Sequence, residues 1–269
     1  MEAKAIQLIQ DTAVLANAKA LDTFTPAIAL PATVSVVSLE KFQQSRSRFR
    51  GVLETPSLKD FSEYVLTQAD SNTSGFVDSD EMTCTVYFNL GDQDNPGHGD
   101  FRAKLTLKKT AAFIALERAA GSKHTQKDLS DFIEDWAPNL KALNPEGVDI
   151  DLRRATGAIR SITIEQARKN EHVVGDMSAS RSAMDQIEAK SAEGLPAELL
   201  FSVIPYEGLQ AQTIQLRVAV LTGGDQPILR LRWIGEAQLR ENLAQEFKHA
   251  VAKQVGDAIV LTIGSFVLP

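Results

Sequence analysis

The sequence has a single cysteine, no long apolar run and no excess of positive charge, and each of these shortages excludes a class of protein. Cys84 has no partner for an intramolecular disulfide, and no Cys/His spacing around it fits a zinc site. No stretch approaches the roughly 20 apolar residues that span a bilayer. The first 21 residues lack the basic start and apolar centre of a signal peptide. We therefore expect a cytoplasmic location and no membrane partner.

The charge balance is acidic, with 28 basic and 35 acidic residues and a formal net charge of −7. Free nucleic-acid binders usually carry a basic excess, because their cations displace counterions from phosphates. The overall balance therefore argues against nucleic-acid binding, although a local basic face could still bind nucleic acid. The acidic balance suits a soluble protein that meets other proteins, or one whose acidic surface imitates a nucleic-acid backbone.

Motifs of several large enzyme classes are also missing. No GxxxxGK loop or GxGxxG turn follows a strand pattern, and no GxSxG motif occurs, so P-loop, Rossmann and nucleophile-elbow sites are unsupported. No two of the four histidines are four residues apart, which excludes a helical zinc pair. We predict no cofactor, metal or catalytic residue. Spacing cannot test a triad or carboxylate cluster that only the fold assembles.

The clearest pattern is the alternation of apolar and polar residues in two neighbouring segments, 82–90 and 101–108. A period of two over such a length predicts half-buried antiparallel strands, which the polar segment 91–100 would join. Cys84 falls on the apolar face of the first strand, which favours a buried structural thiol. The same alternation in 213–221 and 229–233 predicts a second hairpin.

Helices and further strands are predicted around these hairpins. Apolar residues at helical spacing, with capping and breaking residues, predict helices at 2–20, 57–69, 110–120, 125–136, 148–170 and 237–255. Strands are predicted at 33–39, 199–205 and 258–267. Hairpins interrupted by helices are typical of an α+β fold with mostly antiparallel sheets. With a linker at 144–147, the chain would form two hairpin-plus-helix halves, 1–143 and 148–269, or one continuous domain.

Four segments resemble the YfdQ-like family of phage and prophage proteins: VYFN at 86–89, GHGDFRAKLTL at 97–107, DFIEDW at 131–136 and LPAELLFSVIPYEG at 195–208. Their order and spacing are also similar to that family, over about residues 50–235. The resemblance implies a bacteriophage or prophage origin and an intracellular role during infection. It implies neither a biochemical activity nor any functional residue.

Basic side chains gather on the polar faces of the two predicted hairpins, next to one aromatic side chain. The predicted binding residues are Tyr87, His98, Asp100, Arg102, Lys104, Lys108, Arg230 and Arg232. Cationic strands that carry an aromatic can hold single-stranded nucleic acid, because the ring stacks on a base and the cations contact phosphates. The alternative is an ordinary solvated sheet face, since edge strands often carry lysine.

The loop 92–100 contains the Asp and His residues that metal ions prefer. An EF-hand needs a glutamate at the twelfth position, and counting from Asp92 that position is Ala103. The loop is therefore interpreted as a solvated turn in which aspartates cap the backbone.

Three functions remain as hypotheses. The first is a non-enzymatic phage accessory protein that binds a host or phage protein, or nucleic acid, in DNA metabolism or counter-defence. The second is a metal-dependent nuclease that uses carboxylates such as Asp92, Asp94 and Asp100. The third is a self-assembling structural protein, a homo-oligomer whose copies pair through helix 2–20 and the last strand.

Overall fold

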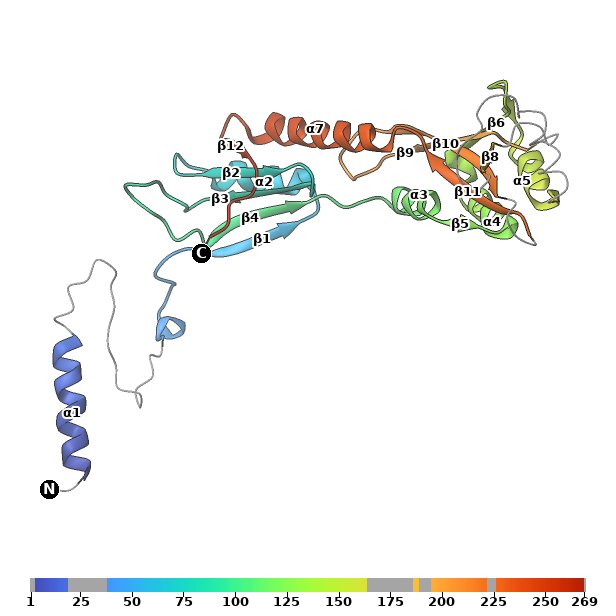
Figure 1. The fold of residues 1–269 in the computed structure, drawn as a ribbon. Coiled ribbons are helices and arrows are strands. Elements are labelled where there is room, and N and C mark those ends of the chain that lie inside the picture. The colour runs from blue at the N-terminus through green and yellow to red at the C-terminus, as the bar shows by residue number, and fades with distance from the viewer. Residues whose placement is uncertain (1–2, 19–37, 164–185, 189–194, 222–225, 269) are drawn as a thin grey trace, which may run out of the picture. The chain divides into compact units, whose positions relative to one another are not determined.

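The computed structural model of the chain describes residues 3–18, 38–163, 186–188, 195–221 and 226–268 (Figure 1). The chain forms two compact units, Met1–Phe49 and Arg50–Pro269. The first unit contains helix α1 (Ala3–Ala18) and the short 3-10 helix η1 (Glu40–Phe42). The predicted helix at 2–20 is thereby confirmed for its described residues. The second unit contains every strand found among the described residues and carries the candidate sites.

The first of two sheets in this unit has five strands in the order β1-β4-β3-β2-β12. Their bounds are β1 (Gly51–Thr55), β2 (Ser74–Asp78), β3 (Thr83–Tyr87), β4 (Phe101–Thr106) and β12 (Val260–Ile263). β3 pairs antiparallel with β2 and with β4, whereas β1 and β12 run parallel to their neighbours at the two edges. Helix α2 (Leu58–Gln68) packs on one face of this sheet, where its Phe61 and Val65 are buried.

The second sheet is antiparallel throughout, in the order β5-β11-β10-β9-β6-β7, and β8 also pairs with β10. Its strands are β5 (Lys123–His124), β6 (Leu140–Leu143), β7 (Asp149–Ile150), β8 (Gln186–Glu188), β9 (Glu198–Val203), β10 (Gln212–Leu221) and β11 (Ile228–Trp233). One face is covered by helices α3 (Ala111–Gly121), α4 (Gln126–Asp135) and α5 (Leu152–Ser161). The 3-10 helix η2 (Ala137–Asn139) leads into β6.

Helix α7 (Glu236–Val255) connects the two sheets, because it follows β11 of the second sheet and precedes β12 of the first (Figure 1). Its side chains Leu243, Phe247 and Val251 are buried, and the helix contacts α2. A short antiparallel ladder also pairs the segment between β4 and α3 with the loop after β9. The backbone N–H of Thr110 donates to Pro205 O at 3.1 Å, and that of Glu207 donates to Lys108 O at 3.0 Å.

The α+β class with mostly antiparallel sheets is confirmed, and so are the two hairpins. Ser57 caps α2, since its Oγ accepts from the backbone N–H of Asp60 at 3.2 Å. The burial of Cys84 is confirmed as well, and its side chain is fully enclosed in the core. In each hairpin the alternation follows burial, because one face packs on helices and the other does not.

Some predicted boundaries are wrong. The helix expected at 148–170 is α5, which begins after its cap Asp151 and ends at Ser161, and β7 precedes it. The strand expected at 258–267 covers only Val260–Ile263. The edge strand β1 and the inner strand β2 were not predicted. The strand expected at 33–39 and most of segment 171–194 lie outside the described residues.

The predicted linker at 144–147 is the turn between β6 and β7. Asn144 closes it, because its backbone N–H donates to Val148 O at 2.9 Å and its Oδ1 accepts from Val148 N at 2.8 Å. The division of the chain into halves at this point stays a prediction. Among the described residues, no helix has both the length and the apolar character to cross a bilayer.

Candidate nucleic-acid interface

The second sheet carries a set of basic side chains on the face opposite helices α3, α4 and α5. Strand pairing places them together, because residues directly opposite each other on neighbouring strands share a face. Arg217 lies opposite Arg232, and Arg230 lies opposite Lys123. Lys141 belongs to the same face, since it pairs with Leu200, which in turn pairs with Gln215, two residues before Arg217. We call these five cations, Lys123, Lys141, Arg217, Arg230 and Arg232, the basic face.

The basic face is accessible, and its cations outnumber the acidic residues that share it. Four of the cations are exposed, and Arg217 is half-buried. Three acidic residues share this face. The carboxylate of Glu198 lies 3.9 Å from Arg217 Nη2 and accepts from Gln215 Nε2 at 2.6 Å. The register also places Asp149 on this face, next to Glu198 through Leu143, and Glu188 opposite Ala219. Arg230 and Arg232 have no ion-pair partner among the described residues. Like charges opposite each other destabilise a sheet, and both Arg217 with Arg232 and Arg230 with Lys123 are such pairs.

The width of the basic face suits a polyanion. Lys123 on β5 and Lys141 on β6 are separated by β11, β10 and β9. At about 4.8 Å between strands, this separation is roughly 19 Å. Duplex DNA carries one charge per about 1.7 Å of its axis, so roughly 11 phosphates fall within that span. The face can therefore contact several phosphates at once.

Sequence reasoning identified two members of the basic face and missed three. Arg230 and Arg232 were predicted because they alternate with leucines in β11. Lys123 and Lys141 lie in strands of two and four residues, which are too short for a period of two to be recognised. Arg217 occupies a polar position of a predicted strand, and that alternation is the signal that could have identified it.

The first sheet carries the other predicted cationic strand, and there the outcome differs. Arg102 is half-buried and Lys104 is exposed, on the face opposite α2. Tyr87, expected on the polar face and open for stacking, is only 3% exposed. Its hydroxyl donates to Phe266 O at 3.0 Å, and the guanidinium of Arg102 lies 5.9 Å from its ring centre. The exposure expected for Tyr87 is thus wrong, because the C-terminal segment covers the ring.

The remaining predicted residues are dispersed. His98 is exposed in the loop before β4. Asp100 is half-buried, and its Oδ1 accepts from Asn89 Nδ2 at 2.9 Å. Lys108 lies beyond the end of β4 and pairs with Glu207 at 3.1 Å. The eight predicted residues therefore fall on two sheets rather than in one groove, and their role in binding stays a prediction.

The loop after Leu90 is a backbone-capping turn. Asp92 Oδ1 accepts from the backbone N–H groups of Asp94 and Asn95, at 2.9 and 2.6 Å. Within the ranges that the structure describes, no three His, Cys, Asp or Glu side chains are grouped so that they could hold a metal ion. The buried thiol of Cys84 is also not poised for chemistry, because burial raises its pKa to about 12 and a nucleophile must be a thiolate.

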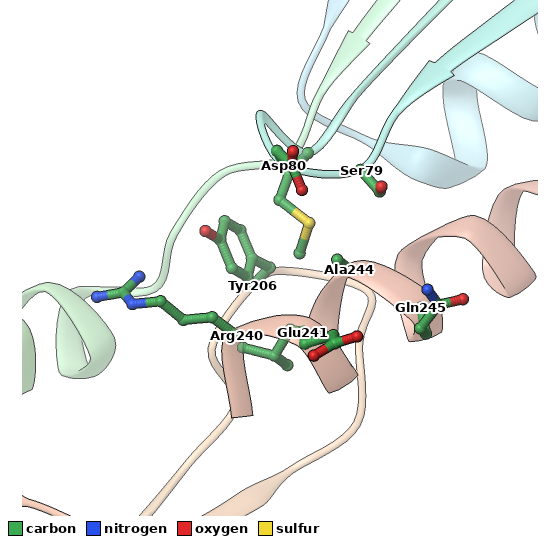
Figure 2. Close-up of a pocket in the computed structure, with 9 residues that line it drawn as sticks. Ser79, Asp80, Tyr206, Arg240, Glu241, Ala244 and Gln245 are labelled. Carbon is green, nitrogen blue, oxygen red and sulfur yellow. The ribbon is translucent and has the colours of Figure 1, made fainter. Parts of the chain in front are cut away.

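A cavity of about 480 Å³ lies where the β2–β3 turn, the loop after β9 and helix α7 meet (Figure 2). Its lining residues are Ser79, Asp80, Met82, Tyr206, Arg240, Glu241, Leu243, Ala244 and Gln245. Burial raises the pKa of Tyr206, although Lys109 acts in the opposite direction. The phenol therefore stays neutral in the physiological range.

Arg240, the cation of this cavity, is already neutralised. Burial by itself would lower its pKa, but hydrogen bonds and charge from Glu236 and Glu117 outweigh burial and raise it. Its Nη2 lies 2.8 Å from Glu236 Oε1 and 3.1 Å from Glu117 Oε1, and its guanidinium stacks 5.4 Å above the ring centre of Trp233. Lys109 joins the same network through Glu117 at 2.9 Å. The network connects α3 with α7 and leaves no free cation for an anionic ligand.

Comparison with known proteins identifies a family. No curated protein and no solved structure matches the chain. One family model, described as an uncharacterized conserved protein (DUF2303), matches residues 2–266, which is nearly the whole sequence. The chain therefore belongs to the DUF2303 family of uncharacterized conserved proteins.

Proposed function

We propose that this protein is a non-enzymatic nucleic-acid-binding protein whose basic face contacts the phosphate backbone. The observation that carries the proposal is the gathering of five cations on one face of the second sheet, in a chain whose net charge is −7. Even beside the acidic residues Glu188, Asp149 and Glu198, the cations of this face are in excess, whereas the chain as a whole is acidic. A polyanionic partner would account for this local excess of positive charge.

The mode of binding follows from the side chains available. Arginine and lysine contact phosphates and release condensed counterions, which gives affinity without sequence preference. Among the described residues of the basic face there is no aromatic side chain, since Trp233 and Phe201 lie on the helix-covered face. Base stacking therefore contributes little there, and we expect affinity to depend steeply on salt and weakly on sequence.

The biological setting is part of the proposal. The resemblance to the YfdQ-like family of phage and prophage proteins favours a phage or prophage origin. Binding without catalysis then suits a role in phage DNA metabolism or in counter-defence, inside the host cell. An acidic host protein that imitates nucleic acid would be recognised by the same cations, so it is an outcome of the test rather than a separate proposal.

The test is the equilibrium affinity for a short labelled duplex, measured by fluorescence anisotropy from about 50 to 200 mM salt. Wild type is compared with the double variant Arg230→Ala/Arg232→Ala. We expect the variant to bind about tenfold more weakly at low salt. We also expect the slope of log K against log salt to fall by about 2, because two phosphate contacts are lost.

A matched control removes the same charge elsewhere. Lys59 on α2 and Lys127 on α4 are exposed, and each makes only an exposed ion pair within its own helix. The Lys59→Ala/Lys127→Ala variant should bind like wild type. Equal losses in both variants would mean that net charge alone drives binding, and no binding by wild type at low salt would refute the proposal.

A further inference from the structure

An aromatic and basic cluster lies on the first sheet, on the face opposite α2. Phe76 on β2 and Tyr87 on β3 are in edge contact, with ring centres 5.9 Å apart. The register places Tyr87 opposite Arg102, and it places Lys104 between Thr85 on β3 and Glu54 on β1. Two aromatic rings with two cations beside them have the composition of a surface that stacks bases and neutralises phosphates. We call Phe76, Tyr87, Arg102 and Lys104 the aromatic platform.

The chain's own C-terminal segment covers this platform. After β12, the backbone N–H of Gly264 donates to Val77 O at 2.8 Å, and its φ of +124° turns the chain across the sheet. The segment ends beside the loop that precedes β4 (Figure 1), where Leu268 fills the space in which a Cβ on Gly99 would stand. We call residues 264–268 the tail.

The contact between tail and platform resembles the stacking of a base. The ring of Phe266 stacks on Phe76, with centres 5.0 Å apart and planes at 27°. The same ring makes an edge contact with Tyr87 at 6.0 Å. Tyr87 also donates its hydroxyl hydrogen bond to the backbone oxygen of Phe266. A flat ring and an acceptor oxygen thus occupy the platform where a nucleobase would place its own ring and its carbonyl.

The tail is held lightly. The side chain of Phe266 remains 42% exposed and that of Val267 84% exposed. The main contacts that hold the tail on the platform are the hydrogen bond from Tyr87 and the stacking of Phe266 on Phe76. A segment with so little buried surface opens at a small fraction of the cost of global unfolding.

We propose that the aromatic platform is a binding site for single-stranded nucleic acid and that the tail is its intramolecular competitor. Bases stack on Phe76 and Tyr87 when Phe266 leaves, and Arg102 and Lys104 contact the phosphates. This site is separate from the basic face, which binds the backbone without stacking. The tail lowers the apparent affinity by the fraction of molecules in which the platform is open.

The experiment uses the full chain and a labelled oligothymidylate in anisotropy titrations. All proteins carry Arg230→Ala/Arg232→Ala, so that binding at the basic face does not mask the platform. Phe266→Ala should raise the affinity about tenfold, because it removes the competing ring. Tyr87→Phe should raise it severalfold, because it frees the tail and keeps the stacking surface. Val267→Ala, in the same segment but away from the platform, should change nothing.

A further substitution separates release of the tail from a general loosening. Adding Phe76→Ala to Phe266→Ala should abolish most of the gain, since the released platform then lacks the ring on which Phe266 stacks. Circular dichroism and thermal melting establish that each variant folds. If Phe266→Ala does not fold, Tyr87→Phe decides the question, because it removes only one oxygen. The proposal is overturned if the folded Phe266→Ala and Tyr87→Phe variants bind oligothymidylate no more tightly than the Arg230→Ala/Arg232→Ala parent. This outcome is independent of whether the basic face of the wild-type protein binds duplex.

Discussion

The two sheets are built alike on one face and differently on the other. Each buries an apolar face under helices, with Phe61 of α2 on the first and Phe113 of α3 on the second, both fully enclosed. On the opposite face the first sheet holds aromatic rings that the tail covers. The second sheet holds exposed cations that no described ion pair neutralises, apart from Arg217 beside Glu198.

This difference shows that the residue types on a strand face do not determine whether that face is accessible to a ligand. The alternation of apolar and polar residues predicts which side chains point away from the core, and it does so equally for Arg102 and for Arg232. Whether those side chains meet solvent depends on segments distant in sequence, and Phe266 reaches Tyr87 across 179 residues. Two strand faces with similar sequence patterns therefore differ in accessibility, because the tail covers the aromatic platform and leaves the basic face open.

The largest expected effect compares a core ring of the second sheet with the tail ring on the outer face of the first. Phe201 on β9 is fully buried, with ring contacts to Phe132 at 6.0 Å and Trp136 at 6.2 Å. Phe201→Ala should lower the free energy of unfolding by about 3–5 kcal/mol, because it leaves a cavity in the core. Phe266→Ala should cost only about 1 kcal/mol, since its ring is partly exposed. Urea unfolding measures both, and equal losses would contradict the lightly held tail.

A smaller effect distinguishes the sheets at alkaline pH, because only the first carries a buried thiol. The folded pKa of Cys84 is raised to about 12, so the unfolded chain releases its proton first. Stability is then complete below the unfolded pKa and is lost as pH rises toward the folded one. At about pH 10.5 the loss through Cys84 is about 2 kcal/mol.

Cys84→Ala provides the control, since ionisation of other groups such as Tyr206 affects both proteins. The variant is less stable near neutral pH, because a buried side chain is shortened. Its disadvantage should shrink by about 2 kcal/mol between roughly pH 8 and pH 10.5. Chemical unfolding at both pH values measures the change, and a constant difference would show that the thiol is not desolvated.

The smallest effect compares one lysine from each outer face. Lys141→Ala should weaken duplex binding about threefold and lower the salt slope by about 1, because it removes one phosphate contact. Lys104→Ala should leave duplex binding unchanged while the tail occupies the aromatic platform. The same anisotropy titration reads both, and a larger loss for Lys104→Ala would reverse the assignment of the two faces.

Much of the fold could be predicted, because the long hairpin strands bury one face and show it as a period of two. The short strands could not. β5 and β7 have two residues each, and their pairing is set by neighbours far along the chain. The parallel edge pairs, β1 with β4 and β2 with β12, were likewise invisible, since no local pattern records which strands meet.

The candidate sites were predicted only in part for the same reason. Arg230 and Arg232 are two residues apart in one strand, so the sequence itself shows that they share a face. That Lys123 and Lys141 lie on the same face as these arginines depends on the strand order of the sheet. The covering of Tyr87 depends on where the tail runs after β12, which no spacing near Tyr87 reveals.

Lysine footprinting with and without bound duplex tests the contrast between the two faces most directly. Acetylation detected by mass spectrometry reports the accessibility of Lys123 and Lys141 on the basic face, Lys104 on the aromatic platform and Lys59 on α2, all of which are exposed in the free protein. We predict that duplex protects Lys123 and Lys141, whereas Lys104 and Lys59 react as before. Unchanged reactivity at Lys123 and Lys141 in a saturated complex, or protection of Lys104 alone, would contradict the account.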